Sequence, residues 1–232
     1  MKNEAIDLVD FHSHILPHAD HGSSSVDTSL FQLNEAKAHG VNRIIATPHF
    51  YPTSHRLDTF IERRNEAYLR LSKLMNSETP EIKLGAEVLI CDCIEELPGL
   101  EKLFINGTNT LLLELPFSTF SERYCDSVYT LCNRGVDVVI AHADRYNSLN
   151  IEMLVDSGAR IQLNADSLDR FFMKKTCVRW LEKGLVVALG SDIHGNDKMA
   201  YQHFVKAQAK IGKYLSYVKK ESDKIFDSAK SI

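Results

Sequence analysis

No stretch of this chain approaches the roughly 18 consecutive apolar residues that a membrane-spanning helix requires. The first residues, Met1–Asp7, carry charges where a secretory signal peptide needs an apolar core. Both absences argue against insertion into a membrane and against export. We therefore expect a cytoplasmic protein.

The sequence also lacks a strong charge of either sign. It holds 27 Lys and Arg residues against 31 Asp and Glu residues, a formal net charge of -4. Such a balance provides no general attraction to nucleic acid or to an anionic membrane. Because the chain has no basic stripe or aromatic platform either, a nuclease or another nucleic-acid-binding protein is disfavoured.

Cysteine is scarce, and none of the five cysteines belongs to a CxxC pair: Cys91, Cys93, Cys125, Cys132 and Cys177. Reduced thiols in a cytoplasmic protein are the simplest interpretation. A cysteine-based tyrosine phosphatase would need a low-pKa cysteine followed six residues later by arginine. The residues at that distance are Leu97, Gly99, Leu131, Val138 and Lys183. That class of enzyme is excluded.

Short apolar runs that end in a polar side chain recur along the chain. Runs rich in Val, Ile and Leu are typical of buried parallel strands. We expect seven strands, near residues 8–12, 42–46, 83–90, 110–114, 136–141, 159–164 and 186–190. Their polar ends, from His12 to Asp192, follow one another at intervals of 22 to 38 residues. These intervals are close to the ~30 residues of a strand–helix–strand unit.

Alternating strands and helices leave two architectures, an open doubly wound sheet and a closed barrel. A doubly wound sheet would spread the polar strand ends along one edge, whereas the rim of a barrel brings them to one point. We therefore favour an α/β barrel. We see no linker and no repeat beyond this alternation, so residues 1–232 are expected to form one domain, with covering helices over about 201–229.

Histidine and carboxylate side chains at the strand ends point to metal binding. His12 and His14 are two apart and leave one face of the first strand; Asp192 and His194 repeat that geometry on the last one. Glu87 and Glu114 interrupt apolar runs, where an ionised carboxylate costs several kcal/mol unless a cation or partner compensates it.

Each of these residues also has a structural interpretation when taken singly. Glu87 or Glu114 would form an ion pair with Arg or Lys, and His49 or His142 would be a hydrogen-bonded core histidine. Their joint placement at equivalent strand ends favours a multinuclear metal site. Imidazole and carboxylate without thiolate suit Mn, Fe or Zn.

Several segments together resemble one known superfamily. They are Asp10-Phe11-His12-Ser13-His14-Ile15-Leu16-Pro17, Ile45-Ala46-Thr47-Pro48-His49, Gly85-Ala86-Glu87, Leu113-Glu114-Leu115-Pro116, Ile140-Ala141-His142-Ala143-Asp144-Arg145-Tyr146, Gln162-Leu163-Asn164 and Ser191-Asp192-Ile193-His194. The chain resembles the PHP (polymerase and histidinol phosphatase) superfamily of metal-dependent phosphoesterases. Within it, the chain is similar to the manganese-dependent bacterial protein-tyrosine phosphatases encoded with capsule and exopolysaccharide genes.

The resemblance implies a distorted (β/α)7 TIM-like barrel with two to three metals, Mn above all, at the C-terminal rim of the strands. The implied ligands are His12, His14, Asp20, His49, Glu87, Glu114, His142, Asp192 and His194. Glu87 would bridge two of the metals. The implied reaction is attack of a metal-bound hydroxide on a phosphotyrosine protein, such as the tail of a bacterial tyrosine kinase that regulates polysaccharide export.

The resemblance also gives roles to three residues outside the ligand set. Arg145 would grip a phosphate with its planar fork, unless it forms a rim ion pair with Asp144 or another carboxylate. His21 stands where the family has an acidic residue; it would act as a general acid, bind the third metal or point away. Lys198 is the only basic residue where the family tends to carry a second one.

Two other functions stay open from the sequence. The chain could be a PHP phosphatase for a small metabolite such as histidinol phosphate, which a deep, covered pocket would favour over an open rim. It could also be a non-catalytic binding module that keeps its metals for stability.

Overall fold

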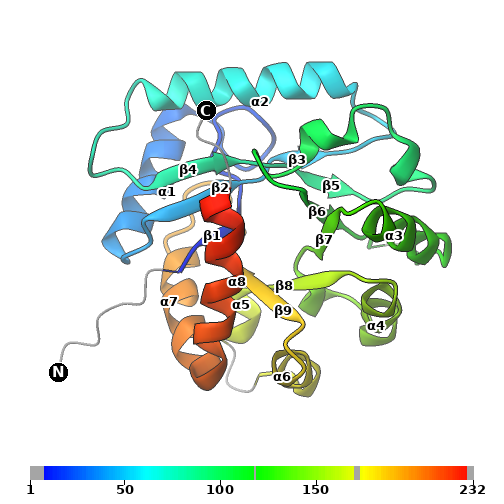
Figure 1. Cartoon of the computed structure of the whole chain (residues 1–232). Helices are drawn as coiled ribbons and strands as arrows, with labels where there is room; N and C mark the ends of the chain where they lie inside the picture. Colours follow the sequence, from blue (N-terminus) through cyan, green and yellow to red (C-terminus); the bar gives the residue numbers. More distant parts are fainter. Residues whose placement is uncertain (1–7, 118, 170–172, 229–232) are drawn as a thin grey trace.

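The computed structural model of the chain describes residues 8–117, 119–169 and 173–228. Nine parallel strands form one curled sheet (Figure 1). They are β1 (Asp10–Ser13), β2 (Arg43–Ala46), β3 (His49–Phe50), β4 (Glu81–Leu84), β5 (Glu87–Leu89), β6 (Thr110–Glu114), β7 (Asp137–Ile140), β8 (Arg160–Asn164) and β9 (Val186–Gly190). The segment Met1–Asp7, considered above as a possible export signal, lies outside the described residues.

The strand order is β3-β5-β6-β7-β8-β9-β1-β2-β4. The edge strands belong to two chain segments that pair twice: β2 with β4, and β3 with β5. Arg43 pairs with Glu81 and His49 with Glu87, so both ladders keep one offset, 81 − 43 = 87 − 49 = 38 residues. The sheet is therefore curled, and its two edges come from neighbouring stretches of the same two segments.

Seven strands were expected, and the described residues form nine. The two-residue strand β3 was not predicted, and the strand predicted at 83–90 is divided into β4 and β5. The break after β2 contains Pro48, which has no N–H group to donate to a ladder. The pairing resumes at His49 and Glu87, two of the predicted metal ligands.

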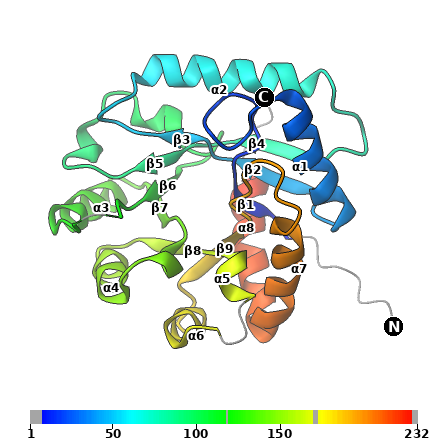
Figure 2. The same cartoon turned by 180° about the vertical axis from the view of Figure 1, so that it is seen from behind.

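Helices surround the curled sheet (Figures 1 and 2). They are α1 (Val26–Ala38), α2 (Leu57–Ser72), α3 (Arg123–Asn133), α4 (Ser148–Asp156), α5 (Ala165–Leu168), α6 (Lys175–Glu182), α7 (Ala200–Ile211) and α8 (Leu215–Ser228). Helices α7 and α8 confirm the predicted covering helices, except that residue 229 lies outside the described residues. None of the described helices is long and apolar enough to span a membrane.

Alternation along the strands divides the core into two apolar clusters. On β6, Leu111 and Leu113 belong to the cluster that packs against the surrounding helices, whereas Leu112 belongs to an inner cluster. Ile225 and Phe226 of α8 complete the inner cluster. Both faces of the sheet carry buried apolar side chains because parallel strands are covered on both sides.

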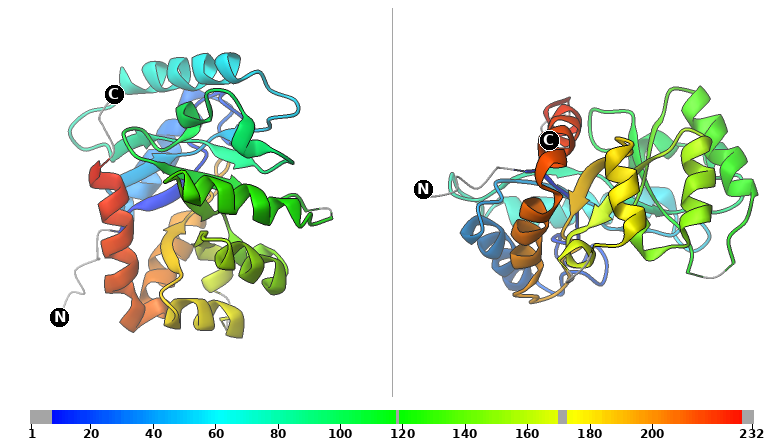
Figure 3. Two further views of the ribbon diagram at one scale, coloured as in Figure 1. Left: turned by 45° about the vertical axis from the view of Figure 1, so that its right-hand side comes forward. Right: turned by 90° about the horizontal axis from the view of Figure 1, so that it is seen from below.

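Helix α8 lies at the end of the sheet where the strands begin (Figure 3). Arg43, the first residue of β2, donates to Asp223 of α8 at 2.8 Å, and Lys224 of α8 lines a cavity with Thr110 and Asp137, the first residues of β6 and β7. Since α8 occupies this end, the opposite end, where the strands finish, is the one that can open to a ligand.

Candidate metal centre

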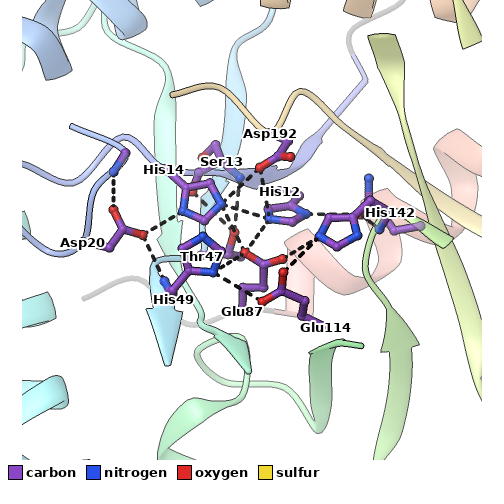
Figure 4. A network of polar contacts seen from close by, with 12 residues as sticks. His12, Ser13, His14, Asp20, Thr47, His49, Glu87, Glu114, His142 and Asp192 are labelled. Carbon is purple, nitrogen blue, oxygen red and sulfur yellow. Dashed lines mark hydrogen bonds and ion pairs between the residues drawn. The ribbon is translucent and has the colours of Figure 1, made fainter. Parts of the chain in front are cut away.

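The strand ends bring the predicted ligands into one buried cluster (Figure 4). Eight of the nine lie near the C-terminal end of a strand, either in its second half or within four residues after it. They are His12, His14, His49, Glu87, Glu114, His142, Asp192 and His194. Asp20, the ninth, comes from the loop after β1 and reaches the cluster through His14. All nine are therefore together at one end of the sheet.

Three of these side chains, His12, His14 and Glu87, direct one atom each toward a common point, and Asp192 lies beside the two imidazoles. Nε2 of His12 lies 3.1 Å from Nε2 of His14 and 3.1 Å from Oε2 of Glu87. Oδ1 of Asp192 lies 3.6 Å from His12 and 3.2 Å from His14. Tetrahedral ligands about 2.0–2.2 Å from an ion are about 3.3–3.6 Å from one another. The atoms of His12, His14 and Glu87 are spaced to share one bound cation, and Asp192 lies beside the two imidazoles.

Hydrogen bonds on the far side of the two imidazoles set their orientation and their neutral tautomer. Nδ1 of His12 lies 3.2 Å from Oε1 of Gln162, and Nδ1 of His14 lies 2.7 Å from Oδ2 of Asp20. Since both partners are acceptors, each Nδ1 donates a hydrogen bond, and in the neutral ring each Nε2 keeps a lone pair that a cation can bind. Two lone pairs and two carboxylate oxygens face one another, an arrangement that a cation stabilises.

Glu87 occupies the middle of the cluster. Its Oε1 lies 2.8 Å from Nε2 of His142, and its Oε2 lies 2.9 Å from Nδ1 of His49 as well as near the first group. Glu114 lies 3.6 Å from His49 and 3.8 Å from His142. Neither Oε2 of Glu87 nor Nδ1 of His49 has a hydrogen-bond partner although both atoms are buried. These groups can hold a second cation beside the first.

Asp20 differs from the other carboxylates because hydrogen bonds occupy both of its oxygens. Oδ2 accepts from His14 and from the backbone N–H of His49 at 2.9 Å, and Oδ1 accepts from the N–H of Gly22 at 2.8 Å. His194, in contrast, leaves its buried Nε2 without a partner, and its ring stacks 4.1 Å from that of His14. In this arrangement Asp20 orients His14, whereas His194 presents a donor atom.

The electrostatics of the cluster favour added positive charge. Burial opposes charge on His49, but Glu114 and Glu87 outweigh it and raise the pKa of His49 to about 9. Burial alone would raise the pKa of Glu87; the imidazoles around it, His12 first, instead hold that pKa well below its usual range. His194 behaves oppositely, because burial and His14 lower its pKa to about 4 and keep it neutral.

Two of the ligand candidates have a left-handed backbone. His142 has φ 31° and Asp192 has φ 52°, a region that costs a residue other than glycine of order 1–3 kcal/mol. His142 N–H is held by Gln162 at 2.7 Å, and Asp192 N–H donates to the carbonyl of His12 at 2.9 Å. These bonds hold the turns after β7 and β9 so that both side chains face the cluster.

A cavity of about 230 Å³ opens onto the cluster. Its described lining consists of His21, His49, Tyr51, Glu87, Glu114, Phe117, His142, Arg145, Asp192 and His194, with no cysteine among them. Arg145 donates from Nη2 to Oδ2 of Asp192 at 2.6 Å. His21 does not point away from the cavity, and its ring stacks 4.8 Å from that of His49. Lys198 is exposed and does not belong to the lining.

Sequence reasoning assigned no role to two buried polar residues that support the cluster. Gln162 contacts both His12 and the backbone of His142. Asp10 accepts from the backbone N–H of Ser191 at 2.8 Å and from its hydroxyl at 2.6 Å, which joins β1 to β9. A period-two pattern was the available signal, because Asp10 shares a strand face with His12, and Gln162 with Asn164.

The profile of the family described as "Capsular polysaccharide synthesis, CpsB/CapC" matches residues 8–229. This chain belongs to that family. The resemblance inferred from the motifs is thereby confirmed.

One relative is the tyrosine-protein phosphatase YwqE of Bacillus subtilis, 30% identical over 231 residues, which are 93% of this chain and 89% of the relative. Another is the tyrosine-protein phosphatase CpsB of Streptococcus pneumoniae, 27% identical over 206 residues, 82% and 84% of the two chains. Among solved structures, those of YwqE and CpsB, described as unique metal-dependent tyrosine phosphatases, provide a match with a TM-score of 0.78. That match has 24% identity and covers 97% of this chain and 96% of the other, and it shows a shared fold.

Proposed function

We propose that this chain is a metal-dependent protein-tyrosine phosphatase. The observation that carries the proposal is the cluster of metal-binding atoms from His12, His14 and Glu87, with Asp192 beside the two imidazoles, next to a cavity that Arg145 also lines. A cation cluster beside an arginine is suited to phosphoryl chemistry. The names of the CpsB/CapC relatives support the choice of a tyrosine phosphatase.

Two to three divalent cations would be held by the predicted ligand set, with Mn proposed first and Fe or Zn compatible with the same donors. His12, His14, Glu87 and Asp192 would hold one; Glu87, Glu114 and His142 would hold the next; His49 and His194 would hold a third. Asp20 was predicted to bind this third cation. Its hydrogen bonds support a role in orienting His14 instead.

Divalent cations bound there would lower the pKa of a water molecule to make a nucleophile at neutral pH, and would neutralise charge on the phosphoryl oxygens. The chain itself binds and orients the substrate. Among the described residues, the Arg145 side chain donates a hydrogen bond to Asp192, through Nη2, and Asp166 and Asp144 add electrostatic attraction. Its other N–H groups are available to bind phosphoryl oxygens and turn the ester bond toward the cluster.

His21 is proposed to assist departure of the leaving oxygen, since it is an exposed imidazole on the cavity wall. A phenolate leaving group has a pKa of about 10, far below that of an alkoxide. Proton donation is therefore less important for phosphotyrosine than for an alkyl ester. This difference supports an aryl phosphate as the substrate class. The described cavity lining includes no second basic residue at Lys198 that would strengthen phosphate binding.

We further propose that the described residues form one catalytic domain built on a seven-unit barrel. The constant offset of 38 residues supports it, because β2 and β3, and likewise β4 and β5, then count as one interrupted strand each. The physiological substrate would be a phosphotyrosine protein of polysaccharide synthesis, such as the tail of a tyrosine kinase. The family description and the names of the relatives support this assignment.

The decisive experiment compares two substrates on one preparation. The protein is stripped with a chelator, reloaded with Mn and assayed against a phosphotyrosine peptide and histidinol phosphate. We expect no activity after stripping, recovery with Mn, and higher kcat/KM for the peptide. Higher kcat/KM for histidinol phosphate would support the metabolite phosphatase instead, and no activity with either would support the binding module.

A variant without cysteine provides the control for the nucleophile. Burial raises the pKa of the Cys177 thiol to about 11 and raises that of Cys132 as well, so neither is a reactive thiolate at neutral pH. Replacement of all five cysteines by serine or alanine should leave the Mn-dependent activity largely intact. Activity that survives stripping but is lost in this variant would contradict the proposed mechanism.

A further inference from the structure

Phe117 is a large apolar side chain that stays 74% exposed although it lines the metal cavity. It follows β6, three residues after Glu114, whose buried carboxylate lines the same cavity. Other exposed large apolar side chains of the described residues, such as Leu149 on α4, do not line it. An exposed aromatic ring beside a polar cavity is available to a bound molecule.

The ring of Phe117 is placed by contacts that lead back to the metal centre. It lies 5.8 Å from the ring of Tyr146 at 37°, and Tyr146 lies 5.4 Å from the ring of His142. The hydroxyl of Tyr146 donates to the carbonyl of Leu115 at 3.0 Å, so the two loops that carry these rings are joined. Arg145 directly precedes Tyr146. The aromatic ring and the phosphate-binding arginine therefore have a defined relative position.

Tyr51 is a second aromatic residue of the same cavity lining. Its ring packs 5.4 Å from that of His49 at 22°, which holds it beside another ligand candidate. The cavity thus combines cation ligands and one arginine with two aromatic rings. This combination suits a ligand that has a phosphate at one end and an aromatic ring next to it.

We propose that Phe117 is a specificity-determining residue, and that it stacks on the phenol ring of phosphotyrosine while the phosphate reaches Arg145 and the cation ligands. The proposal rests on the proposed function. Rings stack at centroid distances of 4.5–7 Å, the range that Phe117 already shows with Tyr146. Phosphoserine has a single methylene between its phosphate and its backbone, so it has no ring to stack on Phe117.

Two phosphonates, which the enzyme cannot hydrolyse, test whether Phe117 binds the aromatic ring of a ligand. Phenylphosphonate and methylphosphonate share the anionic group and differ in the ring. Their dissociation constants are measured by calorimetry on Mn-loaded protein and on F117A, F117L and L149A, each checked for metal content. We expect the native protein to bind phenylphosphonate about 10-fold more tightly than methylphosphonate. F117A should lose most of that preference through weaker phenylphosphonate binding, F117L should keep part of it, and L149A should keep all of it.

The preference retained in F117A, or absent from the native protein, would overturn the proposal. A kinetic arm uses phosphotyrosine and phosphoserine peptides: F117A should raise KM for the first about 10-fold and leave kcat/KM for the second unchanged. If phenylphosphonate binding depends on Phe117 but phosphotyrosine is not hydrolysed, the proposed phosphatase function is wrong and the proposed role of Phe117 in ring binding is supported. If F117A and the native protein hydrolyse phosphotyrosine equally, the proposed role of Phe117 is wrong and the proposed phosphatase function is supported.

Discussion

Arg145 reaches the metal centre through a shared oxygen of Asp192. Its Nη2 donates to Oδ2 of Asp192 at 2.6 Å, and the side-chain amide of Asn164 donates to the same oxygen at 3.1 Å. Loss of Arg145 therefore leaves Asp192 with one hydrogen-bond donor. The arginine can act on the substrate without being needed to keep the ligand in place.

We predict that Arg145→Ala lowers kcat/KM for a phosphotyrosine peptide by about 100-fold, because a charged donor to the phosphoryl group is lost. Arg145→Lys should recover only part of the activity, since an ammonium group cannot bind two oxygens in a fork. Steady-state kinetics measure the loss, and elemental analysis measures the bound Mn.

The matched control is Arg134→Ala. Arg134 pairs with Glu96 on the surface, away from the cavity lining, and its removal should leave kcat/KM unchanged. Full activity in Arg145→Ala would contradict a phosphate contact. A parallel loss of Mn and activity in that variant would show that Arg145 acts through Asp192 instead.

At the scale of elements, the close approach of β9 to β1 places His12. Gly190 ends β9 where a Cβ atom would lie 2.6 Å from Cβ of His12 and 2.6 Å from Nε2 of Gln162. Cβ of His12 is attached to the backbone of β1 and cannot rotate out of the way. Only glycine lets the two strands and Gln162 meet at this distance.

We therefore predict that Gly190→Ala moves His12 and loosens the metal site. The Mn affinity should fall by about 10- to 100-fold, the usual result of displacing a group that supports a ligand. The free energy of unfolding should fall by about 1–3 kcal/mol through overpacking. Calorimetric titration with Mn and urea unfolding give the two quantities.

Gly85→Ala serves as the control at another strand break. There the nearest atom to an added Cβ is Cγ1 of Ile105 at 3.3 Å, so that side chain has to shift by only a few tenths of an ångström and no ligand side chain is touched. We expect nearly native Mn affinity for this variant. An unchanged Mn affinity in Gly190→Ala would show that the strand contact does not control the position of His12.

At the scale of the whole molecule, the buried polar groups of the metal centre lower the stability of the fold when no cation is bound. His12, His14 and Glu87 are fully buried, and their facing lone pairs have no mutual hydrogen bonds once the outer nitrogens carry the protons. Groups of this kind destabilise a folded chain unless a cation compensates them. A cation that binds the folded chain alone stabilises it by mass action.

We predict that bound Mn raises the melting temperature by about 10 °C. A free Mn concentration 1,000 times the Kd adds about 4 kcal/mol, and each kcal/mol shifts Tm by about 2–4 °C in a chain of this size. Scanning calorimetry with and without a chelator gives the shift. Glu87→Gln, which removes the central charge, should nearly abolish it; identical melting temperatures of the stripped and loaded native protein would refute the prediction.

The sequence by itself determined the class of fold and predicted which residues gather at one end of the sheet. Apolar runs that end in His12, His49, Glu87 or Asp192 indicate parallel strands with ligands at one rim. Such runs can be recognised locally, because a strand buried on both faces is apolar at successive positions. The predicted ligands indeed gather at one end of the sheet (Figure 4). Arg145 and His21 also line the cavity there.

The tertiary structure alone decided how these residues are paired. Asp20 contacts His14, Arg145 contacts Asp192 across 47 residues, and Gln162 contacts His12 across 150. Such contacts depend on strand order and register, which a local pattern does not contain. The breaks after β2 and β4, the exposed ring of Phe117 and the closure of the sheet by α8 have the same origin. Each depends on which distant segments pack together, and that is a property of the folded chain.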